Sequence, residues 1–289
     1  MKADGKELSK ILTIELKNKM EKLNNINFVV ILVGNDTNSL IYIKYKQKKC
    51  EELGINFKLN QYDINISEKE LLCEIIKINT DISIDSCIIQ LPLPLHLNQN
   101  NVLNSLDPKK DADGFTFYNL GRLIKHNKND FIIKPATVLG IEKIINYYNI
   151  ETKGKNIVII GKSVIVGTPL GLVLSNESTY SGTITLCDKN TENLQEVCKN
   201  ADILIVSVGK HNLIDHTFEL KKSVSIIDVG INRIKDESKK SGFKTEGDVE
   251  FNYFEDKCEF ITPVPGGVGP MTVICLIENI INLKRNSLK

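Results

Sequence analysis

Residues 156–169 read Asn156-Ile157-Val158-Ile159-Ile160-Gly161-Lys162-Ser163-Val164-Ile165-Val166-Gly167-Thr168-Pro169. The apolar run at 156–160 predicts a buried strand, and Gly161 predicts the turn that ends it. Proline suits the first position of a helix, so we expect the next helix to open at Pro169. A strand, a turn and a helix in this order can bind a phosphate at the N-terminus of the helix.

The same stretch departs from the two best-known phosphate-binding motifs. It is not Gly-x-Gly-x-x-Gly, because Ser163 occupies the position of the second glycine. Gly161-Lys162-Ser163 resembles the end of a Walker A motif, but the glycine required five residues before Gly161 is Asn156, inside the strand. An ordinary strand-to-helix turn without a ligand also explains these residues, so dinucleotide binding stays open at this point.

Strand-like and helix-like runs alternate on both sides of this stretch. Strands are expected at 28–33, 57–62, 87–89, 183–187, 203–207 and 225–229, and helices at 8–20, 39–53, 68–79, 137–148 and 271–281. Residues 109–133 read as a polar loop. Strands that alternate with helices predict an α/β fold with parallel sheets.

Length, charge and cysteine content limit the function further. The 289 residues allow about two domains, and 37 basic against 36 acidic residues give a net charge of +1, which argues against a nucleic-acid binder. No apolar run is long enough to span a membrane, and the first residues lack the apolar core of a signal peptide. Seven cysteines without a Cys-x-x-Cys pair predict neither disulfides nor a structural zinc site, so we expect a cytoplasmic protein.

Several polar residues in the first half could carry chemistry. Tyr42 and Lys46 lie four residues apart on one predicted helix and therefore share a face, where a partly buried lysine suits proton transfer. Gln90 ends a predicted strand, where side chains face the crevice of an α/β sheet. Lys110-Asp111-Ala112-Asp113-Gly114 puts two acids in a loop without the further ligands of a calcium site, and the four histidines show no metal-ligand spacing. Each residue taken alone is also compatible with a solvated surface, and we expect no metal.

The end of the next predicted strand leaves the nucleotide type open. Asp188 could bond the ribose hydroxyls of NAD, whereas Lys189 could hold the 2′-phosphate of NADP. Arginine occurs only three times in the chain, so a lysine here can reflect composition as much as function.

Taken together, the ordered motifs resemble the methylenetetrahydrofolate dehydrogenase/cyclohydrolase family. The matching blocks are Tyr42-Ile43-Lys44-Tyr45-Lys46, Gln90-Leu91-Pro92-Leu93-Pro94, Lys110 to Gly114, Asn119 to Leu123, Pro135 to Gly140, Gly161 to Pro169, Asp228 to Asn232, Gly247-Asp248-Val249 and Pro263-Val264-Pro265-Gly266-Gly267-Val268-Gly269-Pro270-Met271-Thr272. The last block is the most specific, and the resemblance covers nearly the whole chain.

The resemblance implies a fold and an activity. The expected fold has two α/β domains, with a folate domain at 1–135 completed by the C-terminal helix at 262–289, a Rossmann-like NAD(P)-binding domain at 136–261, and the active-site cleft between them. The implied enzyme oxidises 5,10-methylenetetrahydrofolate with a nicotinamide cofactor. It then hydrolyses the product to 10-formyltetrahydrofolate, which feeds purine biosynthesis. The expected partners are tetrahydrofolate one-carbon derivatives and a second copy of the chain, with neither nucleic acid nor membrane.

The resemblance also implies roles for single residues. Lys46 would act as general acid/base or position water, Gln90 would hydrogen-bond Lys46, Tyr42 would pack on the folate, and Asp113 would bind the pterin. Further substrate contacts are implied for Pro263, Gly266 and Gly267. Cofactor contacts are implied for Gly161, Lys162, Ser163, Val166, Gly167, Pro169, Lys189, Gly209, Ile231 and Thr272.

Some positions depart from the family pattern. Ala136 and Val138 replace the usual Cys and Pro, Lys162 replaces Arg, and Asp188-Lys189 stands where His followed by Ser or Arg is common. Lys162 and Lys189 favour NADP and Asp188 opposes it, so we expect NADP, with NAD possible. Two alternatives are another two-domain dehydrogenase, of the shikimate or amino-acid type, and a non-catalytic folate- or nucleotide-binding relative.

Overall fold

The computed structural model describes residues 2–21, 23, 25–124, 130–239 and 242–288. The chain divides into two compact units. Unit 1 comprises residues 1–10, 123–130 and 137–272, and unit 2 comprises residues 11–122, 131–136 and 273–289. Each unit is built around its own parallel sheet.

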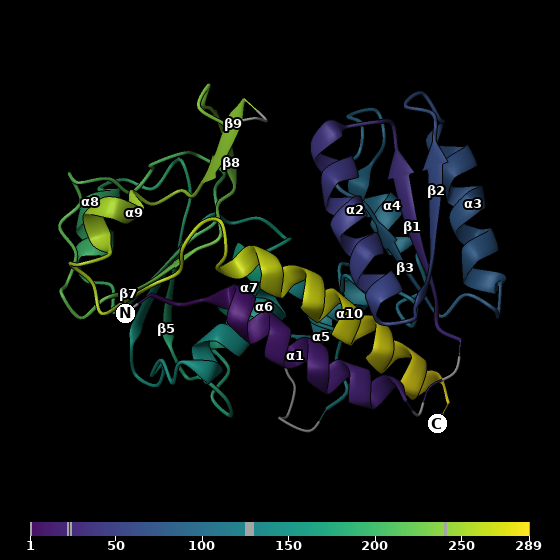
Figure 1. Cartoon of the computed structure of the whole chain (residues 1–289), viewed down its shortest axis with the longest axis horizontal. Helices are drawn as coiled ribbons and strands as arrows, with labels where there is room; N and C mark the ends of the chain where they lie inside the picture. The colour runs from purple at the N-terminus through teal and green to yellow at the C-terminus, as the bar shows by residue number, and fades with distance from the viewer. Residues whose placement is uncertain (1, 22, 24, 125–129, 240–241, 289) are drawn as a thin grey trace. The chain divides into compact units, whose positions relative to one another are not determined.

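Unit 2 contains a three-stranded parallel sheet in the order β2-β1-β3. Its strands are β1 (Asn27–Val33), β2 (Asn56–Tyr62) and β3 (Ser86–Ile89), and its helices are α2 (Thr37–Glu52), α3 (Glu68–Thr80), α4 (Gln99–Asn104) and α5 (Phe117–Arg122). The central strand β1 pairs Phe28 with Phe57 of β2 and with Ser86 of β3. Helices α2 and α3 lie beside this sheet (Figure 1).

The core of unit 2 explains why these segments fold as they do. Helix α3 buries Leu71, Ile75 and Ile78, which recur at helical spacing, against apolar residues of β1 and β3. Ser67 and Glu70 close its N-terminus as a capping box, which satisfies N–H groups that the helix leaves free. The strands β1 and β3 are almost wholly buried, as expected of a parallel sheet covered on both faces.

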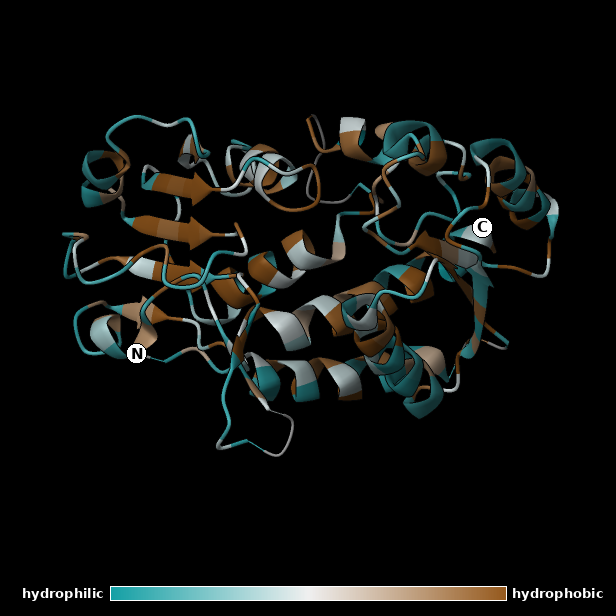
Figure 2. Cartoon of the chain, turned by 90° about the horizontal axis from the view of Figure 1, so that it is seen from above, coloured by the Kyte–Doolittle hydropathy of each residue, from teal (hydrophilic) through white to brown (hydrophobic). Residues whose placement is uncertain are grey.

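Unit 1 contains a five-stranded parallel sheet in the order β10-β7-β6-β4-β5. The strands are β4 (Asn156–Ile160), β5 (Thr183–Cys187), β6 (Ile203–Val206), β7 (Ser225–Asp228) and β10 (Phe260–Ile261), and β8 (Asn232–Lys235) with β9 (Phe243–Glu246) form a separate antiparallel hairpin. The helices are α7 (Gly167–Leu174), α8 (Leu194–Lys199), α9 (Phe251–Phe254) and nearly all of α6 (Ala136–Tyr147). The parallel strands are mostly hydrophobic in Figure 2, whereas the loops around them are largely hydrophilic.

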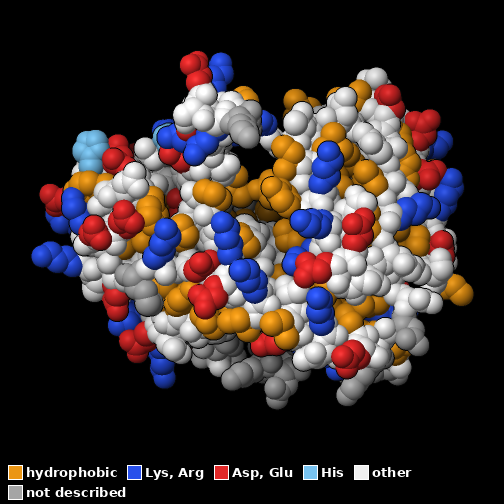
Figure 3. Space-filling model, viewed as in Figure 1, with side chains coloured by type: hydrophobic (Ala, Val, Ile, Leu, Met, Phe, Trp, Pro, Cys, Tyr) orange, Lys and Arg blue, Asp and Glu red, His pale blue; other side chains and the backbone are white. Residues whose placement is uncertain are grey.

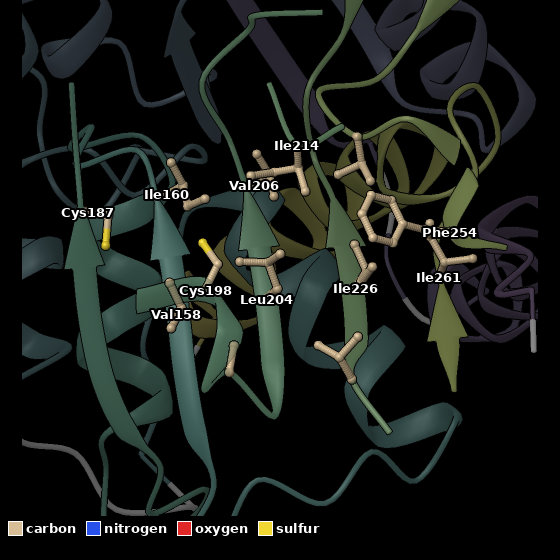
Figure 4. Packing of buried hydrophobic residues seen from close by; sticks show 13 residues of the cluster. Val158, Ile160, Cys187, Cys198, Leu204, Val206, Ile214, Ile226, Phe254 and Ile261 are labelled. Atoms are coloured by element: carbon tan, nitrogen blue, oxygen red, sulfur yellow. The ribbon is translucent and has the colours of Figure 1, made fainter. Parts of the chain in front are cut away.

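One apolar cluster packs on a face of this sheet. Figure 4 shows Val158 and Ile160 of β4, Leu204 and Val206 of β6 and Ile226 of β7 pointing to the same side, where Ile214 and Phe254 cover them. The cluster fixes the carboxyl ends of β4, β6 and β7 next to one another, because neighbouring strands share it. The loops that leave these ends therefore start from a rigid base.

Two long helices contain a boundary between the units. Helix α1 spans Gly5–Met20, and the division falls after Lys10. Helix α10 spans Val268–Ser287, and the division falls after Thr272. Residues 1–10 belong to unit 1, where the amide of Ala3 donates to the carbonyl of Ile261 in β10. The predicted domain limits stay a prediction.

The α/β class and the parallel sheets are confirmed, but some predicted bounds are wrong. Helix α7 begins at Gly167, so Pro169 is its third residue, which the first turn of a helix tolerates. The last helix begins three residues before Met271 and ends at Ser287. Helix α5 lies inside the segment predicted as loop, and α4, α8, α9 and the β8–β9 hairpin were not predicted. All are short, or polar enough to read as connections.

Candidate active site

Lys46 is buried on helix α2 because it shares a face with core residues. Ile43 and Cys50 lie three residues before it and four after it and are both buried. The Asp36 side chain caps this helix by accepting from the amide of Ser39. Only 8% of Lys46 is exposed, whereas Tyr42, one turn earlier, is half-buried. The helix thus carries an amine into a mostly apolar surrounding, which is rare for lysine.

Gln90 faces this amine from the end of strand β3. Its backbone amide donates to the carbonyl of Ile31, which continues the sheet by one residue. Its Oε1 accepts a hydrogen bond from Nζ of Lys46 at 3.0 Å, the contact that the family resemblance implied. Its Nε2 donates to the carbonyl of Leu91 at 2.8 Å, so both ends of the amide have fixed partners. Gln90 therefore presents an acceptor to Lys46.

The loop after β3 separates its two acids into different environments. Asp111 is buried, and its carboxylate accepts from the amides of Gly114 and Thr116 at 2.8 Å and from Nδ2 of Asn119 at 2.9 Å. The loop is tied to β3 through Ala112, whose amide donates to the carbonyl of Cys87. Asp111 thus shapes the loop, and Asp113 is the acid that interacts electrostatically with Lys46.

Burial shifts both ionisable groups toward their neutral forms. Burial lowers the pKa of Lys46 below its ordinary 10.5, and the nearby carboxylate of Asp113 opposes this in part. Burial also raises the pKa of Asp113, against the attraction of Lys46. A lysine with a lowered pKa carries more neutral amine near pH 7 than an ordinary one, so it can accept a proton.

In unit 1, the turn after β4 is held in a form that only glycine permits at two positions. Gly161 has φ +112°, and a Cβ there would collide with the carbonyl oxygen of Ser207 at the end of β6. A Cβ at Gly167 would collide with the carbonyl of Gly161. Oγ of Ser163 accepts from the amide of Val166 at 3.2 Å and orders the turn before α7. This tight strand–turn–helix fits a dinucleotide at the point where β4 lies between β5 and β6.

Of the two lysines predicted to bind the 2′-phosphate, Lys162 already pairs with an acid. Nζ of Lys162 lies 3.5 Å from Oδ2 of Asp188, with 44% and 34% of the two side chains exposed. The other carboxylate oxygen of Asp188 accepts from the amide of Asn190, and this bond, with Lys162, lowers the pKa of Asp188. Lys189 is exposed. Of the three charged residues, Lys162 and Asp188 thus form an ion pair, and Lys189 is the remaining exposed cation.

The remaining predicted ligand-binding residues all lie in unit 1. Gly209 and Ile231 are exposed after the ends of β6 and β7. The hydroxyls of Thr272 and Thr137 lie 3.2 Å apart. The segment from Pro263 to Gly267 joins β10 to α10, and Gly266 accepts at its carbonyl from the amide of Lys6. Lys46, Gln90 and Asp113 form one group in unit 2, and these residues belong to the other unit.

Two buried acids of unit 1 were assigned no role in the sequence. Asp228 accepts from the backbone amides of Gly230, Asp248 and Val249, and Asp248 accepts from those of Val208 and Gly209. Burial raises the pKa of Asp228 to about 7, with Asp248 adding to the effect. The sequence signal for both acids is their place in two matching blocks, Asp228 to Asn232 and Gly247 to Val249. Aspartate is almost never fully buried unless it is paired, so the burial of both points to a structural or functional role.

The part of the chain that the structure describes contains neither a cluster of metal ligands nor a membrane-spanning helix. No group of three or more His, Cys, Asp or Glu there could hold a metal ion. None of the helices described is long and apolar enough to cross a bilayer. Cationic and anionic side chains are interspersed on the face shown in Figure 3, in keeping with the net charge of +1.

Two family models match the chain. Residues 3–113 match the catalytic domain of tetrahydrofolate dehydrogenase/cyclohydrolase, and residues 135–288 match its NAD(P)-binding domain. The bifunctional protein FolD of Fusobacterium nucleatum is 42% identical over 286 residues, which cover 97% of this chain and 96% of that relative.

Solved structures agree with the sequence relatives. A FolD crystal structure from Campylobacter jejuni is 39% identical, covers 99% of both chains and has a TM-score of 0.91. FolD from Trypanosoma brucei, complexed with NADP cofactor and inhibitor, is 27% identical, covers 100% of this chain and 98% of that chain, and has a TM-score of 0.92.

Proposed function

The chain belongs to the tetrahydrofolate dehydrogenase/cyclohydrolase family. From that premise we propose a division of its residues between the two reactions of this bifunctional enzyme. It oxidises 5,10-methylenetetrahydrofolate to the 5,10-methenyl form and hydrolyses that cation to 10-formyltetrahydrofolate. The observation that carries the division is the buried Lys46 amine, held by Gln90 in the folate unit. It is a proton acceptor where hydrolysis needs one.

Lys46 is proposed as the base of the hydrolysis. Water attacks the methenyl carbon, and its proton passes to the neutral amine of Lys46. The resulting ammonium is held by the Gln90 acceptor and by the Asp113 charge. It returns the proton to N5 as the bond from N5 to the former methenyl carbon breaks and the remaining hydroxyl loses its proton to solvent. The sum is methenyl cation plus water giving the formyl product and one proton.

The other folate contacts follow from side-chain chemistry. Asp113 is proposed to bind the pterin, because a carboxylate pairs well with the adjacent N–H donors of an amino-pyrimidine. Tyr42, half-buried one turn before Lys46, is proposed to pack on the folate ring. Pro263, Gly266 and Gly267 are proposed as further substrate contacts, with glycine allowing the backbone close to the ligand.

Oxidation needs contact between substrate and nicotinamide rather than a protein base. A nicotinamide cofactor held there would supply the hydride acceptor for the methylene carbon. The protein holds the cofactor, and we assign that task to Gly161, Ser163, Val166, Gly167 and Pro169 around the turn before α7. Gly209, Ile231 and Thr272 complete the proposed cofactor contacts. The tight turn and the short helix behind it support this assignment.

We further propose that the cofactor is NADP. Lys162 and Lys189 are proposed to hold the 2′-phosphate, with Lys162 exchanging its Asp188 partner for the phosphate. A solved relative complexed with NADP supports the choice. Asp188 opposes NADP binding, so we expect the enzyme to use NAD as well, with a lower kcat/KM.

We also propose an assembly, a location and domain limits. We propose a homodimer in the cytoplasm, acting on neither nucleic acid nor membranes, and seven free cysteines suit a reducing compartment. The proposed domains are 1–135 with 262–289 for folate and 136–261 for the cofactor. The light-scattering mass of the purified protein tests the dimer.

One preparation of the wild-type protein tests the function. It is given 5,10-methylenetetrahydrofolate with NADP or with NAD, and methenyl formation is followed by absorbance; methenyl-folate is then supplied directly without cofactor. Both reactions are expected, with a higher kcat/KM for NADP. Absence of either reaction contradicts the proposed division, and a higher kcat/KM for NAD contradicts the proposed cofactor.

A further inference from the structure

A network around two buried carboxylates ties together three chain segments at the carboxyl edge of the unit 1 sheet. Asp228 is the last residue of β7, and Asp248 follows the β8–β9 hairpin; they are 2% and 0% exposed. The amide of Asp248 donates to Oδ1 of Asp228 at 3.0 Å, and that of Val249 donates to Oδ2 at 2.9 Å. The hairpin therefore returns onto the end of β7.

Asp248 also binds the loop after β6 through hydrogen bonds. Its Oδ2 accepts from the amides of Val208 and Gly209 at 2.7 and 2.9 Å. Its Oδ1 accepts from Nδ2 of Asn232, at the start of β8, at 2.8 Å. Two amides on one carboxylate oxygen fix the direction of that loop, because hydrogen bonds to a charged acceptor are strong and directional.

The backbone passes close to both carboxylates at two glycines. A Cβ at Gly230 would overlap the carboxylate of Asp248, and a Cβ at Gly247 would overlap that of Asp228. The carboxylate of Asp248 thus packs against Gly230, two residues after Asp228. The carboxylate of Asp228 packs against Gly247, which immediately precedes Asp248. Both contacts place the backbone within reach of the carboxylates, which a side chain at either glycine would prevent.

The same segments meet again further along the chain. The amide of Ile214 donates to the carbonyl of Asp248, and the amide of Glu250 donates to that of Ile214. The ring of His211 contacts the carboxylate of Glu246 at the end of β9. The loop from Val208 to Ile214 is therefore attached along its length to residues 246–250.

We infer that Asp248 is a positioning residue for cofactor binding, which holds the Val208–Gly209 loop and the turn carrying Ile231 in the form that the nicotinamide cofactor requires. The inference rests on the proposed cofactor contacts of Gly209 and Ile231. Gly209 is bonded to Asp248 directly, and Ile231 lies between Gly230, packed on Asp248, and Asn232, bonded to it. Asp248 needs no contact with the cofactor to act in this way.

The test compares Asp248→Ala and Asp248→Asn in the full-length enzyme. Asparagine keeps one oxygen that can accept from Val208 and Gly209, while its Nδ2 faces the donor of Asn232. We expect Asp248→Ala to raise KM for NADP in the dehydrogenase reaction roughly tenfold and Asp248→Asn roughly threefold. Cyclohydrolase activity on supplied methenyl-folate, which uses no nicotinamide, should stay within about twofold of wild type.

The split between KM and kcat separates positioning from loss of structure. A variant that is only partly folded has fewer active molecules, so its kcat falls and its KM is unchanged. Asp256→Asn is the matched control, since it makes the same change at an exposed position of unit 1 and should leave both constants unchanged. If Asp248→Ala does not fold, Asn232→Ala leaves the carboxylate of Asp248 in place, removes the Nδ2 donor to Asp248 and to the carbonyl of Gly247, and should raise KM for NADP about threefold.

Two results would overturn the inference. One is a KM for NADP within twofold of wild type in folded Asp248→Ala or, where that variant does not fold, in Asn232→Ala. The other is a fall of kcat in the Asp248 variants with KM unchanged. Wild-type enzyme that fails to oxidise methylenetetrahydrofolate with NADP would instead count against the proposed function, so the two failures are distinguishable.

Discussion

Lys46 of unit 2 and Lys162 of unit 1 are the same type of residue in opposite surroundings. Lys46 is 8% exposed and bonds a neutral amide, Gln90. The side chain of Lys162 is 44% exposed and faces a carboxylate, Asp188. Burial without a bonded anion lowers the pKa of Lys46, which suits proton transfer. An exposed lysine that can leave an anionic partner for another anion suits binding of a phosphate.

The contrast teaches that the surroundings assign the chemistry to each lysine. Both residues lie in motifs, but only the structure shows that one is surrounded by Ile43, Cys50 and Gln90 and the other by Asp188 and solvent. Changes at these two places should therefore affect different reactions and different properties.

The largest effect is expected from Lys46→Met. Removing the base should lower the cyclohydrolase kcat by about 10³-fold, within the usual range for general base catalysis. The fold should persist, because methionine has a similar length and adapts well to an apolar surrounding. Thermal unfolding checks this point. Lys44→Met, on an exposed position of the same helix, is the control and should retain wild-type hydrolysis. Hydrolysis at the wild-type rate in Lys46→Met would show that Lys46 is not the base, and the contrast between Lys46 and Lys162 would then have no chemical consequence.

The next effect concerns the pH dependence of hydrolysis. With Lys46 as base, kcat/KM rises with pH through the pKa of Lys46, which lies below 10.5. The Asp113 carboxylate raises that pKa, so Asp113→Asn should move the rising limb to lower pH. The same change should raise KM for folate roughly tenfold, through loss of a charged hydrogen bond. A limb that stays in place would show that Asp113 does not act on Lys46.

A smaller effect is expected at the exposed pair. Asp188→Asn removes an anion that repels the 2′-phosphate and releases Lys162, so kcat/KM for NADP should rise about threefold, with NAD unchanged or worse. Asp256→Asn, at an exposed position of unit 1, controls for net charge. A fall in kcat/KM for NADP would mean that Asp188 orders the loop for NADP instead of opposing it.

The smallest effect is the stability of Lys162→Met. An exposed ion pair contributes little to folding, because solvent screens it. Denaturant titration should therefore give an unfolding midpoint equal to that of wild type, while KM for NADP rises about threefold. A clear loss of stability would show that Lys162 has a structural role that its exposure does not suggest.

Much of the fold was predictable because its signals are local. The strands at 156–160 and 183–187 match their predicted bounds: the first is an almost continuous apolar run before a turn glycine, and the second alternates threonine with apolar residues. The predicted start of α7 is wrong because proline commonly occupies the first helical position, whereas Gly167 packs so closely on Gly161 that the helix can begin two residues earlier.

The site was predictable in part. Helical spacing put Tyr42 and Lys46 on one face, but the burial of Lys46 depends on packing against the sheet, which spacing does not reveal. The roles of Asp228 and Asp248 depend on contacts between residues 20 apart in sequence and on the loop after β6. The pairing of Lys162 with Asp188 was likewise invisible in the sequence, where each was counted as a separate charge.

The most direct test of the central claim follows one reaction mixture of methylenetetrahydrofolate, NADP and Lys46→Met by the absorbance of methenyl-folate. If Lys46 is the base of the hydrolysis and unit 1 holds the cofactor independently of it, methenyl-folate should form and then accumulate, whereas wild type clears it. Clearance of methenyl-folate at the wild-type rate by the variant would contradict the account.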